Sequence, residues 1–130
     1  MRRSCVLLFC FVLLFVAGCG EDGPKLVPVE GTVTWNGKPL AGAFVRFQPV
    51  DLSGAPSYGE TDEDGHYVLK FTQKRDGAMP GMHTVSIETK NKLTKTAELL
   101  PPEYNEKSTL QREVKDEKST VINFDLPIKK

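Results

Sequence analysis

Alternation of apolar and polar residues is the feature that most constrains the fold of this chain. From residue 27 to residue 35 every second position is an apolar residue or glycine, namely Val27, Val29, Gly31, Val33 and Trp35. A period of two places successive side chains on opposite faces, so this segment is predicted to be a strand with one buried face. Asn36-Gly37 follows directly, and both residues tolerate the positive φ that a tight hairpin turn requires.

The same alternation continues toward the C-terminus and predicts an all-β domain. Ala43, Val45 and Phe47 are expected to face inward, and Trp35 to cap one end of the core. Residues 110–115 and 119–126 are predicted to form a closing hairpin that contributes Ile122, Phe124 and Leu126 to the core. The strands are expected in seven segments separated by turn residues, which is typical of a β-sandwich. These segments are 27–35, 43–48, 57–61, 66–71, 83–89, 110–115 and 119–126.

Residues 90–109 lack clear periodicity, and Pro101-Pro102 restrict the backbone there. A loop of this length inside a compact domain is often functional. Tyr104 lies in it and is expected to be the best exposed aromatic residue, which makes it a candidate ligand-binding residue.

The N-terminus has the layout of a secretory signal. A basic start (Met1 to Ser4) precedes an apolar run over residues 5–16, and the small residues Ala17 and Gly18 precede Cys19. A membrane-spanning helix needs about 20 apolar residues, so the run is short for one. An uncleaved anchor and a signal cut without lipid attachment are the alternatives.

Val16-Ala17-Gly18-Cys19 resembles the bacterial lipobox. The resemblance implies lipid transfer to the Cys19 thiol and cleavage before it, so that Cys19 is the lipidation site and begins the mature chain. The expected organisation is a lipoprotein signal peptide (1–18), a Gly- and Pro-containing tether (19–26) and one β-sandwich domain (27–130). Gly20, rather than Asp, follows the cysteine, and under the sorting rule of well-studied Gram-negative bacteria this favours the outer membrane, at its periplasmic face or at the cell surface.

Cysteine use and charge agree with an exported domain that binds no nucleic acid. Cys5 and Cys10 would leave with the signal, so Cys19 has no partner for an internal disulfide. The whole chain has 17 basic and 17 acidic side chains, and removal of Arg2 and Arg3 leaves 15 against 17. This balance gives no electrostatic case for nucleic acid and no polybasic patch for anionic lipid. Attachment to a membrane is therefore expected through the lipid on Cys19.

Three segments stand out together: Val29 to Ala43, with Asn36-Gly37-Lys38-Pro39-Leu40 at its centre; Thr61-Asp62-Glu63-Asp64-Gly65-His66-Tyr67; and Pro80-Gly81-Met82-His83-Thr84-Val85-Ser86-Ile87. Together they resemble the carboxypeptidase regulatory-like domain, a transthyretin-like sandwich of seven strands. The resemblance implies a fold and no catalytic residues. Gly31 and Gly59 would allow close packing or bulges in strands, and Gly65 would take the left-handed position that ends an acidic turn.

The sequence contains no recognisable catalytic set. His66 and His83 are expected to be exposed or half-exposed strand residues, and neither lies in a nucleophile motif. Asp62 and Asp64 are weak candidates for a calcium site, against the simpler interpretation that their side chains stabilise their own turn. No cofactor is expected.

Two classes of function follow. The first is a non-enzymatic, lipid-anchored module of the cell envelope with a structural or protein-interaction role, or the closely related role of accessory subunit for an envelope enzyme or transporter. The second is a carbohydrate- or calcium-binding module, which would use Tyr104 or the acidic turn.

Overall fold

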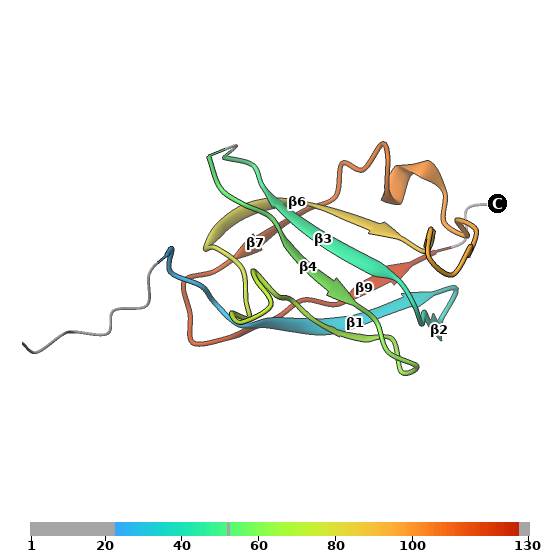
Figure 1. Cartoon of the computed structure of the whole chain (residues 1–130), viewed down its shortest axis with the longest axis horizontal. Coiled ribbons are helices and arrows are strands. Elements are labelled where there is room, and N and C mark those ends of the chain that lie inside the picture. Colours follow the sequence, from blue (N-terminus) through green and yellow to red (C-terminus); the bar gives the residue numbers. More distant parts are fainter. Residues whose placement is uncertain (1–22, 52, 128–130) are drawn as a thin grey trace, which may run out of the picture.

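The computed structural model describes residues 23–51 and 53–127, and the fold over these residues is all-β, with two sheets arranged as a β-sandwich (Figure 1). Each of the seven segments predicted from the alternation contains a strand. The elements are β1 (Val29–Trp35), β2 (Lys38–Pro39), β3 (Phe44–Pro49), β4 (Ser57–Glu60), β5 (His66–Val68), β6 (Gly81–Glu88), the 3₁₀ turn η1 (Pro102–Tyr104), β7 (Gln111–Val114), β8 (Thr120–Val121) and β9 (Phe124–Leu126).

The first sheet is built around β1, which has neighbours along both edges. Antiparallel β5 and β2 pair with it in turn, while β8 and β9 pair with it in parallel. Glu30 lies opposite both Val68 of β5 and Val121 of β8, so these two strands flank β1 on opposite sides. The β1–β2 connection is the predicted tight turn, with φ values of 53° at Asn36 and 75° at Gly37.

The second sheet has the order β4-β3-β6-β7, and all its pairs are antiparallel. The predicted closing hairpin is therefore wrong, because β7 pairs with β6 while β8 and β9 pair with β1 in the other sheet. The alternation in residues 110–126 correctly indicated strands with a buried face. It could not indicate the partner, because residues 115–119 carry the chain from one sheet to the other instead of reversing it within one sheet.

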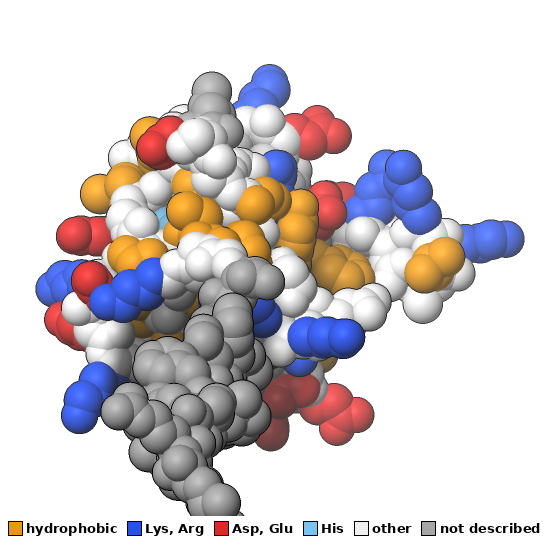
Figure 2. All heavy atoms as spheres, turned by 60° about the vertical axis from the view of Figure 1, so that its left-hand side comes forward, with side chains coloured by type: hydrophobic (Ala, Val, Ile, Leu, Met, Phe, Trp, Pro, Cys, Tyr) orange, Lys and Arg blue, Asp and Glu red, His pale blue; other side chains and the backbone are white. Residues whose placement is uncertain are grey.

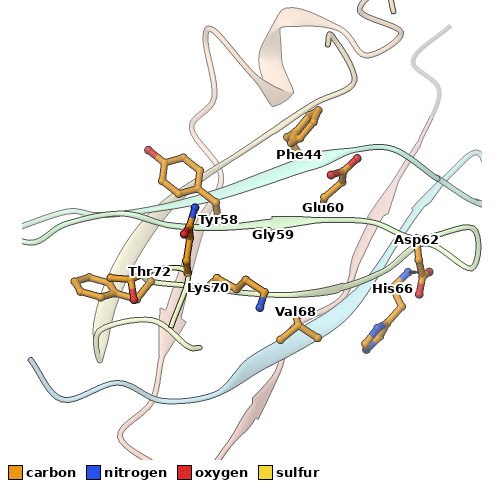
Figure 3. A pocket seen from close by; sticks show the side chains of 11 residues that line it. Phe44, Tyr58, Gly59, Glu60, Asp62, His66, Val68, Lys70 and Thr72 are labelled. Atoms are coloured by element: carbon orange, nitrogen blue, oxygen red, sulfur yellow. Dashed lines mark hydrogen bonds between the residues drawn. The ribbon is translucent and has the colours of Figure 1, made fainter. Parts of the chain in front are cut away.

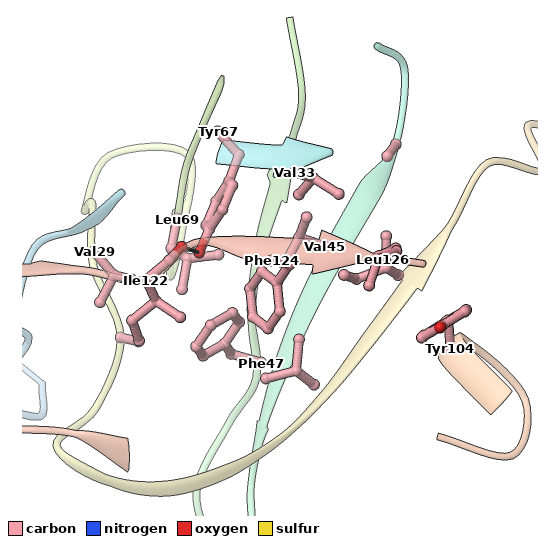
Figure 4. Packing of buried hydrophobic residues seen from close by; sticks show 14 of the residues in the cluster. Val29, Val33, Val45, Phe47, Tyr67, Leu69, Tyr104, Ile122, Phe124 and Leu126 are labelled. Atoms are coloured by element: carbon pink, nitrogen blue, oxygen red, sulfur yellow. Dashed lines mark hydrogen bonds between the residues drawn. The ribbon is translucent and has the colours of Figure 1, made fainter. Parts of the chain in front are cut away.

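The core lies between the two sheets and draws on both (Figure 4). The inward positions predicted in residues 27–35, 43–48, 83–89 and 119–126 are confirmed, except that Trp35 is only partly buried against the core. The buried hydrophobic residues are Val27, Val29, Val33, Leu40, Ala43, Val45, Phe47, Tyr67, Leu69, Ala78, Val85, Ile87, Leu100, Tyr104, Val114, Ile122, Phe124 and Leu126.

The sheet around β1 contains one very close backbone approach. A Cβ atom on Gly31 would lie 1.8 Å from the carbonyl oxygen of Ile122, in the segment that separates β8 from β9. Only glycine fits such an approach within a strand. The buried Tyr67, which pairs with Gly31, donates a hydrogen bond from its hydroxyl to the same Ile122 carbonyl at 2.6 Å (Figure 4). Burial raises the pKa of this hydroxyl despite the nearby positive charge of Arg112.

In the part of the chain that the structure describes, no helix is long and apolar enough to cross a membrane.

Candidate binding groove

A groove lies on the outer surface where the edges of the two sheets meet. β4 is an edge strand of the second sheet, and β5 lies at an edge of the first. The backbones of Tyr58 and Lys70 bond to each other at one end, with N···O distances of 2.9 and 2.7 Å, and the Asp62 amide bonds to the His66 carbonyl at the other, at 2.9 Å. Between these bridges the surface is hollowed to a volume of about 650 Å³ (Figure 3). We call this hollow the seam groove.

Gly59 forms part of the groove and allows β4 to pass close to β5. A Cβ atom at this position would lie 2.9 Å from the carbonyl oxygen of Val68 and 3.3 Å from the ring of Tyr67. A larger residue would therefore push the two sheet edges apart. The prediction that Gly31 and Gly59 permit close packing within strands is confirmed at both positions.

Part of the groove lining is apolar. Phe44 from β3, Tyr58 from β4 and Val68 from β5 line the groove (Figure 3). Phe71, just beyond β5 in the sequence, also lines it. Tyr58 is 53% exposed and Val68 is 38% exposed. Outward positions of a strand normally carry polar side chains, and a contiguous exposed apolar patch often marks a binding site.

Charged groups surround this apolar surface. Glu60 and Asp62 line the end near His66, and Lys70 lies farther along the groove (Figure 3). Lys70 pairs with Asp76 at 3.3 Å, whereas Glu60 forms no salt bridge within residues 23–51 and 53–127. An apolar surface with a few polar groups at its rim is the usual composition of a ligand site. A ligand with both apolar faces and hydrogen-bond donors would match it.

The acidic turn at residues 62–65 has a structural role in its own right. Asp62 Oδ1 accepts hydrogen bonds from the backbone amides of Asp64 and His66, both at 2.9 Å. Gly65 closes the turn with a φ of 75°, as predicted. Among the residues described, no group of three or more His, Cys, Asp or Glu side chains could hold a metal ion, and this includes the surroundings of Asp62 and Asp64.

Tyr104, predicted to be exposed, is buried, with only 7% of its surface accessible. It lies in η1, and its hydroxyl is directed at the carbonyl of Pro127, 3.5 Å away. The prediction of exposure was wrong because a stretch without periodicity can still fold back onto the sandwich. The exposed aromatic residue beside a hollow is Tyr58 instead.

The two histidines lie in different environments. His66 is half-exposed, as predicted, and its Nε2 is 3.4 Å from Glu30. His83 is only 1% exposed, contrary to the prediction, and its ring packs against Phe47 with 5.7 Å between centroids. Its Nε2 lies 2.7 Å from the Met79 carbonyl oxygen. His83 follows the alternation of β6, in which it shares the inward face with Val85 and Ile87.

Comparison with protein-family models, curated proteins and solved structures finds no match. Cys19 and the signal peptide predicted before it lie outside the described residues. The fold and the seam groove are therefore the basis for a functional assignment.

The seam groove was not predicted from the sequence, although a signal for it was present. Phe44 and Tyr58 both occupy outward positions of strands whose inward positions are apolar or small. Phe44 pairs with Glu60, and Arg46 pairs with Tyr58, so the two aromatic residues lie on adjacent strands of one outer face. Outward aromatic residues on neighbouring antiparallel strands would have indicated an exposed apolar surface.

Proposed function

We propose that this protein is a lipid-anchored module of the cell envelope that binds a partner protein and catalyses no reaction. The proposed organisation is a lipoprotein signal peptide, a short tether from Cys19, and a transthyretin-like or immunoglobulin-like sandwich of the carboxypeptidase regulatory-like type. The two-sheet all-β fold and the close approach at Gly31 agree with this proposal. The burial of His83 and the pairing of His66 with Glu30 leave neither histidine beside a hydroxyl or thiol nucleophile in the contacts described.

The observation that carries an interaction role is the apolar seam groove. Folding alone gives no reason to place Tyr58, Val68 and Phe44 on an outer face, because their apolar surface there remains partly in water. Contact with a partner would remove that surface from water, and Tyr is enriched at the energetically dominant positions of protein interfaces. Glu60 at the rim would favour a partner that presents a basic or hydrogen-bond-donating group.

Site-specific photo-crosslinking in native membranes tests this role. We expect a crosslinker at position 58 to give one discrete adduct with an envelope protein. A crosslinker at position 121 is the matched control, because Val121 is 64% exposed but does not line the groove, and β1 separates its strand β8 from β5. Identical adduct patterns from the two positions, or none from position 58, would contradict partner binding through the groove. Turnover of a defined substrate by the purified mature domain would contradict the absence of catalysis.

Carbohydrate binding is the second candidate, and the exposed ring of Tyr58 beside carboxylates favours it. Sugar rings stack their C–H faces on aromatic rings, while their hydroxyls donate hydrogen bonds to groups such as Glu60 and Asp62. Titration with neutral oligosaccharides of glucose and of N-acetylglucosamine, followed by amide chemical shifts, would test it. Shifts confined to the groove and lost in Tyr58→Ala would favour this candidate. Thermal unfolding with and without calcium, in wild type and Asp62→Ala, tests the calcium alternative.

A further inference from the structure

The segment that follows β6 forms an ordered hairpin at the end of the sandwich. Asn91 and Thr96 exchange backbone hydrogen bonds of 3.2 and 3.0 Å. The Asn91 side chain accepts bonds from the amides of Leu93 at 2.8 Å and Thr94 at 3.3 Å, which fixes the turn. Lys95 holds a φ of 55°, a conformation that non-glycine residues adopt only at an energetic cost. We call residues 90–97 the distal hairpin.

Glu98 anchors the base of this hairpin. Its carboxylate accepts hydrogen bonds from the amide and hydroxyl of the buried Thr89, at 3.0 and 2.9 Å, and from the amide of Leu100 at 3.0 Å. Burial acts to raise the pKa of Glu98, but the bonds donated by Leu100 and Thr89 outweigh it and lower the pKa. The hairpin is thus held in place from within the domain.

This ordered hairpin presents an apolar side chain surrounded by cations. Leu93 at its tip is 95% exposed. Lys90, Lys92 and Lys95 are also exposed, and none of them forms a salt bridge among the residues described. In the space-filling view, a narrow projection carries Lys or Arg side chains around a hydrophobic one (Figure 2). Folding does not account for this arrangement, because Leu93 buries almost nothing within the domain.

We propose that the distal hairpin docks on an anionic membrane surface, with Leu93 inserted at the lipid interface and Lys90, Lys92 and Lys95 among the headgroups. A bilayer suits a single projecting leucine because it requires no shape-matched pocket. Lysine stems cover apolar surface while their ammonium groups stay in water, and each lysine is attracted to anionic headgroups. The net charge of the chain did not indicate this basic patch. The patch forms because the turn of the distal hairpin brings the three lysines together.

This proposal deepens the proposed function, since a lipidated domain is already confined to a membrane. The segment that leads into β1 and the distal hairpin lie at opposite ends of the long axis of the sandwich (Figure 1). Contact at both ends would lay the domain flat along the bilayer. A lipid chain combined with a basic patch holds a protein at a membrane far more firmly than one chain does alone.

Vesicle flotation of the unlipidated domain, residues 20–130, tests the proposal independently of Cys19. Among the residues that the structure describes, every member of the buried core lies within residues 27–126, so we expect this part to fold on its own. We expect binding to vesicles of phosphatidylcholine mixed with phosphatidylglycerol, and much weaker binding to pure phosphatidylcholine. Leu93→Ser should weaken binding by about tenfold or more, and Lys92→Gln and Lys95→Gln by about fivefold each.

Val121→Ser and Lys118→Gln are the matched controls, because they remove an exposed valine and an exposed lysine elsewhere and should leave binding unchanged. Equal binding to both kinds of vesicle, or full binding by Leu93→Ser, would overturn the proposal. A concentration-dependent dimer that is lost in Leu93→Ser, with no vesicle binding, would also overturn it and assign the tip to a second copy. If the unlipidated domain does not bind vesicles but Cys19 is lipidated in cells, the docking of the distal hairpin is wrong and the proposed lipid anchor still stands.

Discussion

Gly31 and Gly59 each lie where a strand passes close to the carbonyl of a neighbouring segment, but the two places differ in what covers them. A Cβ atom added at Gly31 would lie 1.8 Å from the Ile122 oxygen, and one added at Gly59 would lie 2.9 Å from the Val68 oxygen. The ring of Tyr67 lies between the two sites, since its hydroxyl bonds to Ile122 and its edge approaches Gly59.

We call these two close approaches the Gly31 junction and the Gly59 junction. The first has a structural role, and the second lies beside a surface for binding. The Gly31 junction is closed, because the Ile122 carbonyl is buried and its hydrogen bond is supplied by Tyr67. The Gly59 junction is closed on its inner side by Tyr67 but open outside, where Tyr58 and Val68 line the seam groove. Substitutions at the first junction should therefore act on stability, and substitutions outside the second should act on binding.

Gly31→Ala should have the largest effect on stability. The added methyl group would overlap a backbone oxygen, which cannot rotate away as a flexible side chain can. We expect a loss of about 3 kcal/mol or more in the free energy of unfolding, as for severe overpacking of a core. Urea unfolding monitored by circular dichroism measures it. A loss below about 1 kcal/mol would show that β8 and β9 can shift freely, and the junction would not be rigid.

Tyr67→Phe should have the next largest effect. It removes the donor to the buried Ile122 carbonyl while keeping the ring, and an unsatisfied buried acceptor costs about 1–3 kcal/mol. Because burial raises the pKa of Tyr67 in the folded state, its contribution is present at neutral pH and is lost as the pH rises past about 10, the value of an unfolded tyrosine. Wild type should therefore lose more stability than Tyr67→Phe between neutral pH and pH values above that point. Parallel pH profiles for the two proteins would contradict this role.

Gly59→Ala should cost less than Gly31→Ala, about 1–2 kcal/mol, because its contacts are longer and one outer side is open. It should also distort the groove, so that crosslinking from position 58 decreases. Chemical denaturation gives the first quantity, and adduct yield gives the second. An effect on stability as large as that of Gly31→Ala would remove the distinction between the two junctions.

Tyr58→Ala should have the smallest effect on stability, within about 0.5 kcal/mol, because the side chain is more than half exposed. It should nevertheless reduce partner binding more than any of the core substitutions that leave the domain folded. Thermal unfolding and quantitative pull-down of the crosslinked partner measure the two effects. A strongly destabilised Tyr58→Ala protein with normal binding would reverse the assignment of the groove.

The strands and the inward face of the sandwich could be predicted from the sequence because the burial of alternate side chains leaves a direct pattern. Val29, Val45 and Ile87 were each placed correctly by that pattern alone. Strand partners could not be predicted in the same way, because alternation reports that a face is buried and not which sheet buries it. The parallel pairing of β9 with β1 depends on where residues 115–119 lead the chain.

The aperiodic stretch of residues 90–109 shows why the candidate sites were harder to predict. One half forms the distal hairpin with Leu93 in water, while the other half buries Leu100 and Tyr104. Both halves contain leucine, threonine and lysine, so the presence of these residues does not show which half is buried. The distinction arises from hydrogen bonds made by the side chains of Asn91 and Glu98, which no periodic pattern records.

Labelling with a palmitate analogue in bacterial cells that express the full chain tests the central claim, a surface-anchored binding module, most directly. Wild type should incorporate the label and fractionate with membranes. Cys19→Ser should lose the label and either remain as unprocessed precursor or release a folded domain. Continued labelling of Cys19→Ser, or an unlabelled wild-type protein recovered entirely in the soluble fraction, would contradict the account.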